Sequence, residues 1–157
     1  MISDTESTKG LKASLDASGV PGSLQYLNSR VAHRCTAIYR LESSTVRCLF
    51  LFDKLGEFTT ELLAIVPLHD SYCQFVLKDG FFFSENTADD RRLDGNSHQG
   101  VVMSYHGIPI VDTDGQLFGT LCHFDMVPQA FSDDEFAYMH AAAKLFTTYL
   151  CDTVQGP

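Results

Sequence analysis

The stretch Ser104–Asp125 constrains the fold most, because two runs of strand-forming residues flank an Asp-Gly pair within it. Glycine accepts a positive φ angle without a Cβ clash, so Asp-Gly between such runs predicts a β-hairpin. We take Asp114 and Gly115 as the central turn residues; a slip of one residue would turn every side chain to the other face. The pairs that this turn predicts are Thr113 with Gln116, Ile110 with Gly119, Ile108 with Leu121, and His106 with His123.

The length and charge of the chain narrow its class. Its 157 residues are enough for one domain with its own core. The net charge is −9, and the pair Arg91-Arg92 is the one cluster of basic residues. Nucleic acids and anionic membranes bind positively charged surfaces, so we expect neither as a partner. No apolar run approaches the ~20 residues that span a bilayer, and no signal-peptide pattern begins the chain, so we expect a cytoplasmic protein.

Five cysteines are scattered along the chain without a C-x-x-C spacing. An odd number without a secretion signal indicates reduced thiols rather than a disulfide framework. Cys73 is expected at the start of a helix, where the helix dipole would lower its thiol pKa and raise its reactivity. The alternative is a small buried hydrophobic residue, which is the interpretation we favour for the strand residues Cys35, Cys48 and Cys122.

The other segments predict an α+β fold with an antiparallel sheet. The elements expected are helices at Gly10–Ser18 and from the N-cap Ser23 onward, a hairpin of Cys35–Leu41 with Thr45–Phe52, a short helix in Glu57–Ala64, a helical turn through Gln74–Leu77 capped by Asp70 or Ser71, a buried strand Phe81–Phe83, and a polar lid Asn86–Gly100. We expect one domain at residues 23–151, preceded by a tail and short helix at 1–22 and followed by a tail at 152–157.

The last helix is the clearest in the sequence. Ser132 and Glu135 form a capping-box pattern, with acidic residues in the first turn that favour the helix dipole. Two apolar stripes follow; they are Phe136, Met139, Ala143, Phe146 and Leu150, and Tyr138, Ala142, Leu145 and Tyr149. Two stripes indicate packing on the sheet and on a further surface, for which a second copy of the chain is one candidate.

Three stretches resemble the GAF domain family of small-molecule sensor modules, over about Ser23 to Leu150. They are His33–Arg40, Asp70–Cys73, and the hairpin Tyr105–Ile110 with Gly115, Gly119–Asp125 and Pro128. The resemblance implies a GAF-like, roughly six-stranded antiparallel sheet with helices on both faces. It implies terminal helices that usually dimerise on one face and, on the other, a ligand pocket closed by a lid. Family members bind cyclic nucleotides, bilins, haem, small organic acids or metals, or nothing known, so the cofactor or ligand is not specified.

The candidate ligand-binding residues are Cys73, Asp89, Arg92, His106 and His123, and we assign no catalytic residue and no metal. The lid charges have two interpretations: a solvated loop with local ion pairs, or an arginine that reaches inward to an anionic ligand. The facing histidines form either a partly exposed pair with satisfied hydrogen bonds, which would still confer pH sensitivity, or two ligands of a metal that needs a third, such as Cys73.

Gly119 lies in mid-strand, where glycine is costly unless something approaches closely. We interpret it as a residue that lets a helix pack on the sheet, with direct ligand contact as the alternative.

We therefore expect a bacterial, non-catalytic sensory module that binds a small molecule under the lid. It would signal through its terminal helices, a homodimer interface or a signalling protein in trans. The alternative is a cysteine-based redox enzyme or sensor related to free methionine-(R)-sulfoxide reductases, using Cys73 with Cys122 or Cys35. That resemblance is incomplete, because those enzymes carry a cysteine in the lid and Asn86–Val102 contains none. A third possibility is a structural dimerisation domain with a collapsed pocket.

Overall fold

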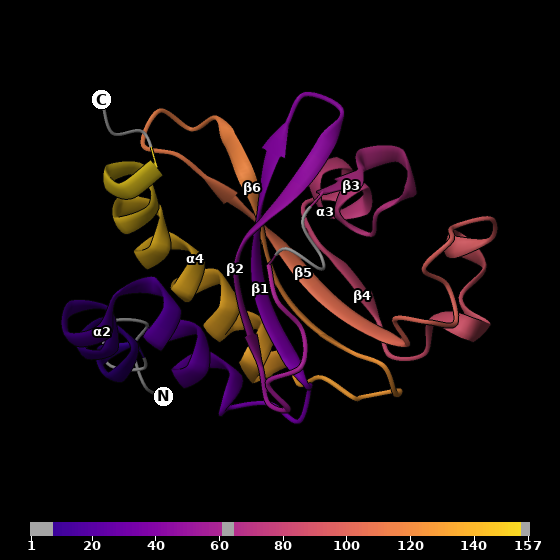
Figure 1. Ribbon diagram of the computed structural model, residues 1–157, viewed down its shortest axis with the longest axis horizontal. Helices are drawn as coiled ribbons and strands as arrows, with labels where there is room; N and C mark the ends of the chain where they lie inside the picture. The colour runs from indigo at the N-terminus through magenta and orange to yellow at the C-terminus, as the bar shows by residue number, and fades with distance from the viewer. Residues whose placement is uncertain (1–7, 61–64, 155–157) are drawn as a thin grey trace.

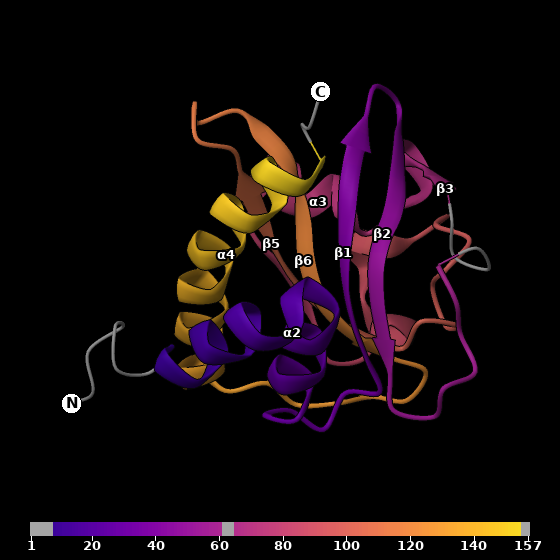
Figure 2. The same ribbon diagram turned by 60° about the vertical axis from the view of Figure 1, so that its left-hand side comes forward.

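The computed structural model describes residues 8–60 and 65–154, which form one six-stranded antiparallel sheet between two layers of helices and loops (Figures 1 and 2). The strand order is β3-β2-β1-β6-β5-β4. The strands are β1 Cys35–Glu42, β2 Thr45–Asp53, β3 Ile65–Pro67, β4 Phe82–Ser84, β5 Ser104–Val111 and β6 Leu117–Asp125. The helices are α2 Lys9–Asn28, α3 Cys73–Asp79 and α4 Asp133–Val154, with short 3-10 turns at Leu68–Asp70, Thr87–Asp89 and Arg91–Leu93. The predicted α+β, GAF-like fold with helices on both faces is confirmed.

Helices α2 and α4 cover one face of the sheet, while α3 and the segment before β5 cover the other (Figure 2). Alternation along each central strand sends successive side chains into the two layers. On the α2/α4 side the sheet contributes Ile38, Ile108, Ile110 and Leu121 to the core. On the α3 side it contributes Ala37, Tyr39, Tyr105, Cys122 and Phe124. Each central strand thus connects the helical core to the opposite layer.

The hairpin of β5 and β6 has three of the expected pairs, with Ile110, Ile108 and His106 opposite the predicted partners. Its turn differs from the prediction. The Gly115 N–H donates to the Asp112 carbonyl at 3.0 Å, so Thr113 and Asp114 occupy the centre and Gly115 follows with φ of 81°. The Asp112 carboxylate stabilises this turn by accepting from two backbone N–H groups. A bulge between the pairs of Ile110 and Val111 restores the expected register.

The first helix is kinked at Gly19, which has φ of 69° and is followed by Pro21. Two helical segments are therefore present, as predicted, but Ser23 is not the N-cap of the second. Its hydroxyl lies inside the segment and donates to the Gly19 carbonyl at 2.8 Å.

Helix α4 begins with half of the predicted capping box. The Glu135 N–H donates to Ser132 Oγ at 3.2 Å, but the Glu135 carboxylate pairs with Arg30 at 2.8 Å instead of reaching back to the cap. Arg30 also lies 3.6 Å from the centre of the Tyr138 ring, and the Tyr149 hydroxyl donates to Asp16 at 2.5 Å. The second apolar stripe therefore packs on α2 and the loop that follows it.

Three segments between β2 and the lid depart from the predictions. Residues 57–60 are not helical, and the rest of the expected helix, 61–64, lies outside the described residues. Strand β3 follows, because Ile65–Pro67 pairs with β2, although no strand was predicted there. Phe81 lies outside β4 and is 47% exposed, so the predicted buried strand is shifted by one residue. No helix in the described part of the chain is long and apolar enough to cross a membrane.

Gly119 allows a strand, rather than a helix, to approach closely. A Cβ atom at this position would lie 1.8 Å from the carbonyl oxygen of Tyr39 in the neighbouring strand β1. Gly119 thus has the predicted structural role of allowing a close approach, but the backbone of β1, and not a helix, is what approaches it. Backbone atoms held in a strand ladder have little room to move away, so a methyl group here would separate β1 from β6.

We expect Gly119→Ala to lower the free energy of unfolding by about 3 kcal/mol, the upper part of the usual range for overpacking a core. Gly95→Ala is the control, because a Cβ there meets no atom within 4 Å and has only the cost of a positive φ, about 1 kcal/mol. Urea denaturation of both variants measures the difference. Equal losses in the two variants would contradict the proposed clash.

Candidate functional site

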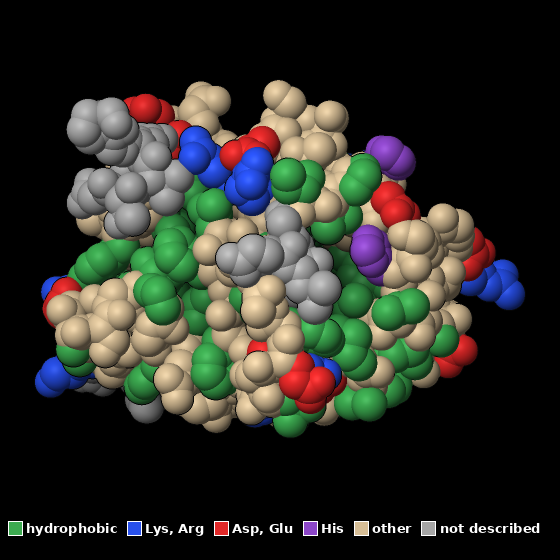
Figure 3. Space-filling model, in the orientation of Figure 1, with side chains coloured by type: hydrophobic (Ala, Val, Ile, Leu, Met, Phe, Trp, Pro, Cys, Tyr) green, Lys and Arg blue, Asp and Glu red, His purple; other side chains and the backbone are tan. Residues whose placement is uncertain are grey.

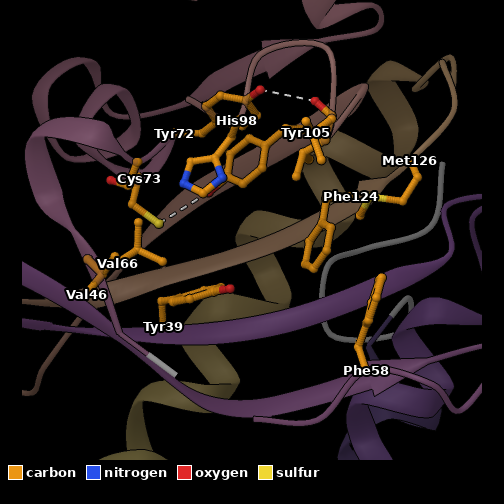
Figure 4. Close-up of a pocket in the computed structure, with 13 residues that line it drawn as sticks. Tyr39, Val46, Phe58, Val66, Tyr72, Cys73, His98, Tyr105, Phe124 and Met126 are labelled. Atoms are coloured by element: carbon orange, nitrogen blue, oxygen red, sulfur yellow. Dashed lines mark hydrogen bonds between the residues drawn. The ribbon is translucent and has the colours of Figure 1, made fainter. Parts of the chain in front are cut away.

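A cavity of about 290 Å³ lies between the α3-side face of the sheet and its cover (Figure 4). Figure 3 shows hydrophobic side chains exposed in a hollow on this face of the molecule. From the sheet side the cavity is lined by Tyr39, Val46, Val66, Tyr105, Phe124 and Met126. From the cover it is lined by Phe58, Ser71, Tyr72, Cys73, His98, Val101 and Val102. Of the predicted lid Asn86–Gly100, His98 lines the cavity, and the two valines directly after the lid complete this wall.

Asp53, at the end of β2, positions the wall that contains Phe58. Its carboxylate accepts two hydrogen bonds from the Arg34 guanidinium, at 2.7 and 2.9 Å. It also accepts from three backbone N–H groups of the next turn, including that of Phe58 at 3.0 Å. The Arg34 guanidinium lies 4.1 Å from the centre of the Phe58 ring. These hydrogen bonds, that from Arg34 first, hold the pKa of Asp53 far below its usual value, so the carboxylate stays charged.

Hydrogen bonds tie the end of the lid to the start of α3. Tyr72 donates from its hydroxyl to the Val102 carbonyl at 3.1 Å, and the Thr87 hydroxyl donates to the same oxygen at 2.7 Å. Asp70 accepts from the Ser97 backbone N–H at 2.9 Å and from the Ser97 hydroxyl. The predicted capping role therefore falls to Ser71, whose hydroxyl accepts from the N–H of Gln74 at 3.2 Å.

Cys73 is the first residue of α3 and lies at the inner end of the cavity (Figure 4). Its sulfur is 3.3 Å from the Thr120 hydroxyl and 3.6 Å from the Tyr105 hydroxyl, and the residue is 4% exposed. Burial raises the pKa of this thiol, although the hydrogen bonds from Thr120 and Tyr105 act in the opposite direction. The prediction that the helix dipole lowers the pKa is therefore wrong, because desolvation outweighs it.

Tyr105 presents its ring to the cavity because the residue two positions along β5 is glycine. A Cβ atom at Gly107 would lie 2.6 Å from a ring carbon of Tyr105. The ring lies across the bare backbone and meets the Tyr72 ring edge to face, with centroids 5.3 Å apart. This glycine is thus a determinant of the cavity's shape.

Two of the predicted site residues, Asp89 and Arg92, belong to the lid but do not line this cavity. Arg92 is bound to Asp90 by two hydrogen bonds at 2.9 and 2.5 Å and donates to the Phe83 carbonyl at 2.6 Å. Asp89 accepts from the Asn86 side chain at 3.2 Å. The arginine charge is therefore neutralised within the lid, as in the interpretation with local ion pairs.

His106 and His123 face each other, but on the α2/α4 side of the sheet, across it from Cys73. A third histidine, His33, lies 4.9 Å from His106 and 5.9 Å from His123 between ring centroids. Phe131 stacks on His106 at 4.2 Å. All three imidazoles are at most 1% exposed. In the described part of the chain, no group of three or more His, Cys, Asp or Glu has the arrangement of a metal site. No spacing in the sequence indicated His33, which lies in the irregular segment between α2 and β1.

A model of the GAF domain family matches residues 24–150. The chain belongs to the GAF domain family. A comparison with curated proteins gives no match.

Solved GAF domains have the same fold. The GAF domain of an Acinetobacter phosphoenolpyruvate-protein phosphotransferase has a TM-score of 0.78 at 12% identity, covering 100% of each chain. The phycocyanobilin-bound GAF domain from a cyanobacterial phytochrome has a TM-score of 0.72 at 13% identity, covering 97% of this chain and 96% of its own. A free methionine-R-sulfoxide reductase from Neisseria meningitidis, in complex with its substrate, has a TM-score of 0.73 at 14% identity, covering 98% and 92%. At these identities the likeness shows the fold alone.

The histidine cluster of this GAF domain is electrically neutral near pH 7. Burial lowers the pKa of His33 to about 4 and that of His106 to about 3, with repulsion between the two rings as a further cause for His106. Burial also holds the pKa of His123 well below its ordinary value. Around His33, Asp125 and Glu85 favour the proton and Lys54 opposes it, but desolvation outweighs them.

We expect the stability of this GAF domain to fall as the pH drops below about 6.5, the ordinary histidine pKa. Between that value and about 4, these two histidines, His33 and His106, are protonated in the unfolded chain but stay neutral in the folded protein. Each of these residues then lowers the free energy of unfolding by about 1.4 kcal/mol per pH unit. Urea denaturation from pH 7 to 4.5 measures the slope.

His106→Phe is the informative variant, because it keeps the stacking on Phe131 and removes one titrating group. The slope should decrease by about 1.4 kcal/mol per pH unit. A free energy of unfolding independent of pH over this range would contradict a buried neutral cluster.

Proposed function

We propose that this GAF domain is a non-catalytic sensory module that binds a small molecule in the cavity under the lid. The main observation that supports this proposal is the cavity of about 290 Å³, which lies between the sheet on one side and α3 and loops on the other. The part of the chain that borders the cavity at the lid end, residues 97–102, is exposed or half-buried and is tied to the start of α3 by hydrogen bonds, so this wall can open at modest cost. A ligand would then favour the closed arrangement of the lid.

A contact between the lid and α4 supports the signalling part of the proposal. Glu85 directly precedes the lid, and its carboxylate accepts from the Phe131 N–H at 3.1 Å. Its carbonyl accepts from the Gln129 N–H at 3.2 Å. Helix α4 begins two residues after Phe131, at Asp133. A change in the lid would thus reach a terminal helix, and from there a homodimer mate or a signalling protein in trans.

The surroundings of Cys73 favour binding over catalysis. Nucleophilic and redox chemistry of cysteine uses the thiolate, which a raised pKa disfavours. The hydrogen-bond partners of the sulfur are hydroxyl groups of Thr120 and Tyr105. Among the described residues, no imidazole or carboxylate hydrogen-bonds this thiol to activate it.

A thermal-shift screen tests the binding function. The panel contains nucleotides, amino acids, organic acids, neutral aromatic compounds and divalent metals. We expect at least one compound to raise the melting temperature by mass action, with about 2.7 kcal/mol of added stability at a concentration of 100 times Kd. Val66→Phe, which fills the cavity from β3, should abolish the shift, while its exposed neighbour Ile65→Phe should retain it. A uniformly flat screen would support the structural dimerisation domain instead.

The redox alternative predicts that the protein reduces free methionine (R)-sulfoxide, whereas our proposal predicts that it does not. With a thioredoxin-like reductant we expect no turnover, because the lid lacks the cysteine of those reductases and the Cys73 thiol is held protonated. Robust turnover that Cys73→Ser abolishes would overturn the non-catalytic proposal.

A further inference from the structure

Among the described residues that line the cavity, none is a Lys, Arg, Asp or Glu. Five Phe and Tyr rings, those of Tyr39, Phe58, Tyr72, Tyr105 and Phe124, border the same space (Figure 4). We propose that the pocket takes an uncharged ligand built on an aromatic ring system of about two fused rings. This inference rests on the proposed binding function and names the class of ligand.

Two arginines near the cavity, Arg34 and Arg92, are already paired with carboxylates. Arg34 is bound to Asp53 behind the Phe58 ring, and Arg92 is bound to Asp90 within the lid. Moving an isolated carboxylate or ammonium group into an apolar site without a partner is strongly unfavourable. The pocket therefore disfavours carboxylates, phosphates and zwitterionic amino acids. The half-buried His98 also lines the cavity, and its ring packs edge to face on Tyr72.

The size and shape of the cavity indicate a ring system. An apolar protein cavity of about 150 Å³ accommodates one benzene molecule. The volume of about 290 Å³ is close to twice that. The aromatic walls favour a flat ligand, because stacked and edge-to-face ring contacts add to the burial of apolar area.

A polar group of the ligand has a place at the inner end of the cavity. There the hydroxyl of Tyr105 and the thiol of Cys73 lie within 3.6 Å of each other, and Thr120 completes the group. Hydroxyl and thiol groups both donate and accept hydrogen bonds without carrying charge. A neutral amide or hydroxyl on the ring matches this end, whereas an anion would meet no Lys or Arg among the described lining residues.

The test compares 2-naphthamide with 2-naphthoate, which have nearly the same shape and differ in charge. Calorimetric titration at pH 7 is expected to give a Kd for the amide at least 100-fold lower than that for the carboxylate. Val66→Phe should abolish amide binding and Ile65→Phe should preserve it. Val66 lines the cavity, whereas Ile65 is 51% exposed and does not.

Met126→Arg supplies the missing cation at a half-buried lining position, and it should narrow or reverse the preference in favour of 2-naphthoate. Equal or stronger binding of 2-naphthoate to the natural sequence, lost in Val66→Phe, would overturn the inference and leave the sensory function intact. Failure of both probes, with a charged compound found in the thermal-shift panel, would do the same. Failure of both probes and a flat panel would overturn the inference and the proposed function together.

Discussion

The pairing of β1 with β6 is the contact on which the rest of the structure depends. Each of the two hairpins closes a short loop, but only this ladder joins them into one sheet, across about 80 residues of chain. Within it, Gly119 lies against the Tyr39 carbonyl, where no side chain fits. The same ladder sets Tyr39 opposite Thr120 on the cavity side and Thr36 opposite His123 on the helical side. The backbone hydrogen bonds between β1 and β6 therefore position side chains in both layers at once.

Local sequence patterns predicted which residues form strands and helices better than they predicted which elements lie beside one another. Alternation and the Asp-Gly pair were sufficient for the pairs of Ile108 and Ile110, because both depend on residues within one hairpin. The turn centre was missed because the Asp112 side chain stabilises a longer loop, which a bulge then compensates. Gly119 was recognised as architectural, but nothing in the order of residues states which backbone lies against it. Strand β3 has three residues and was too short to leave a pattern.

The chemistry of the candidate site was also predicted only in part, because it depends on which residues surround each side chain in the folded protein. The histidine pair was predicted to share a face, and it does, but the sequence did not say which layer covers that face. Cys73 was placed beside the pocket by resemblance, and its ionisation was misjudged. A helix dipole contributes about 0.3–1 kcal/mol at an exposed terminus, which full burial of a charged group easily exceeds. Phe58 was not foreseen, because it is positioned by the tertiary pairing of Asp53 with Arg34.

The cavity walls differ in how much they are tied to the fold. Tyr39 and Tyr105 belong to paired strands, whereas Phe58, His98 and Val101 lie outside helices and strands, and Val101 is 60% exposed. Substitutions at such loop positions reshape the pocket while every strand pair remains in register. The chemical character of the cavity can consequently drift through its loops during evolution, while the strand framework that supports it is inherited unchanged.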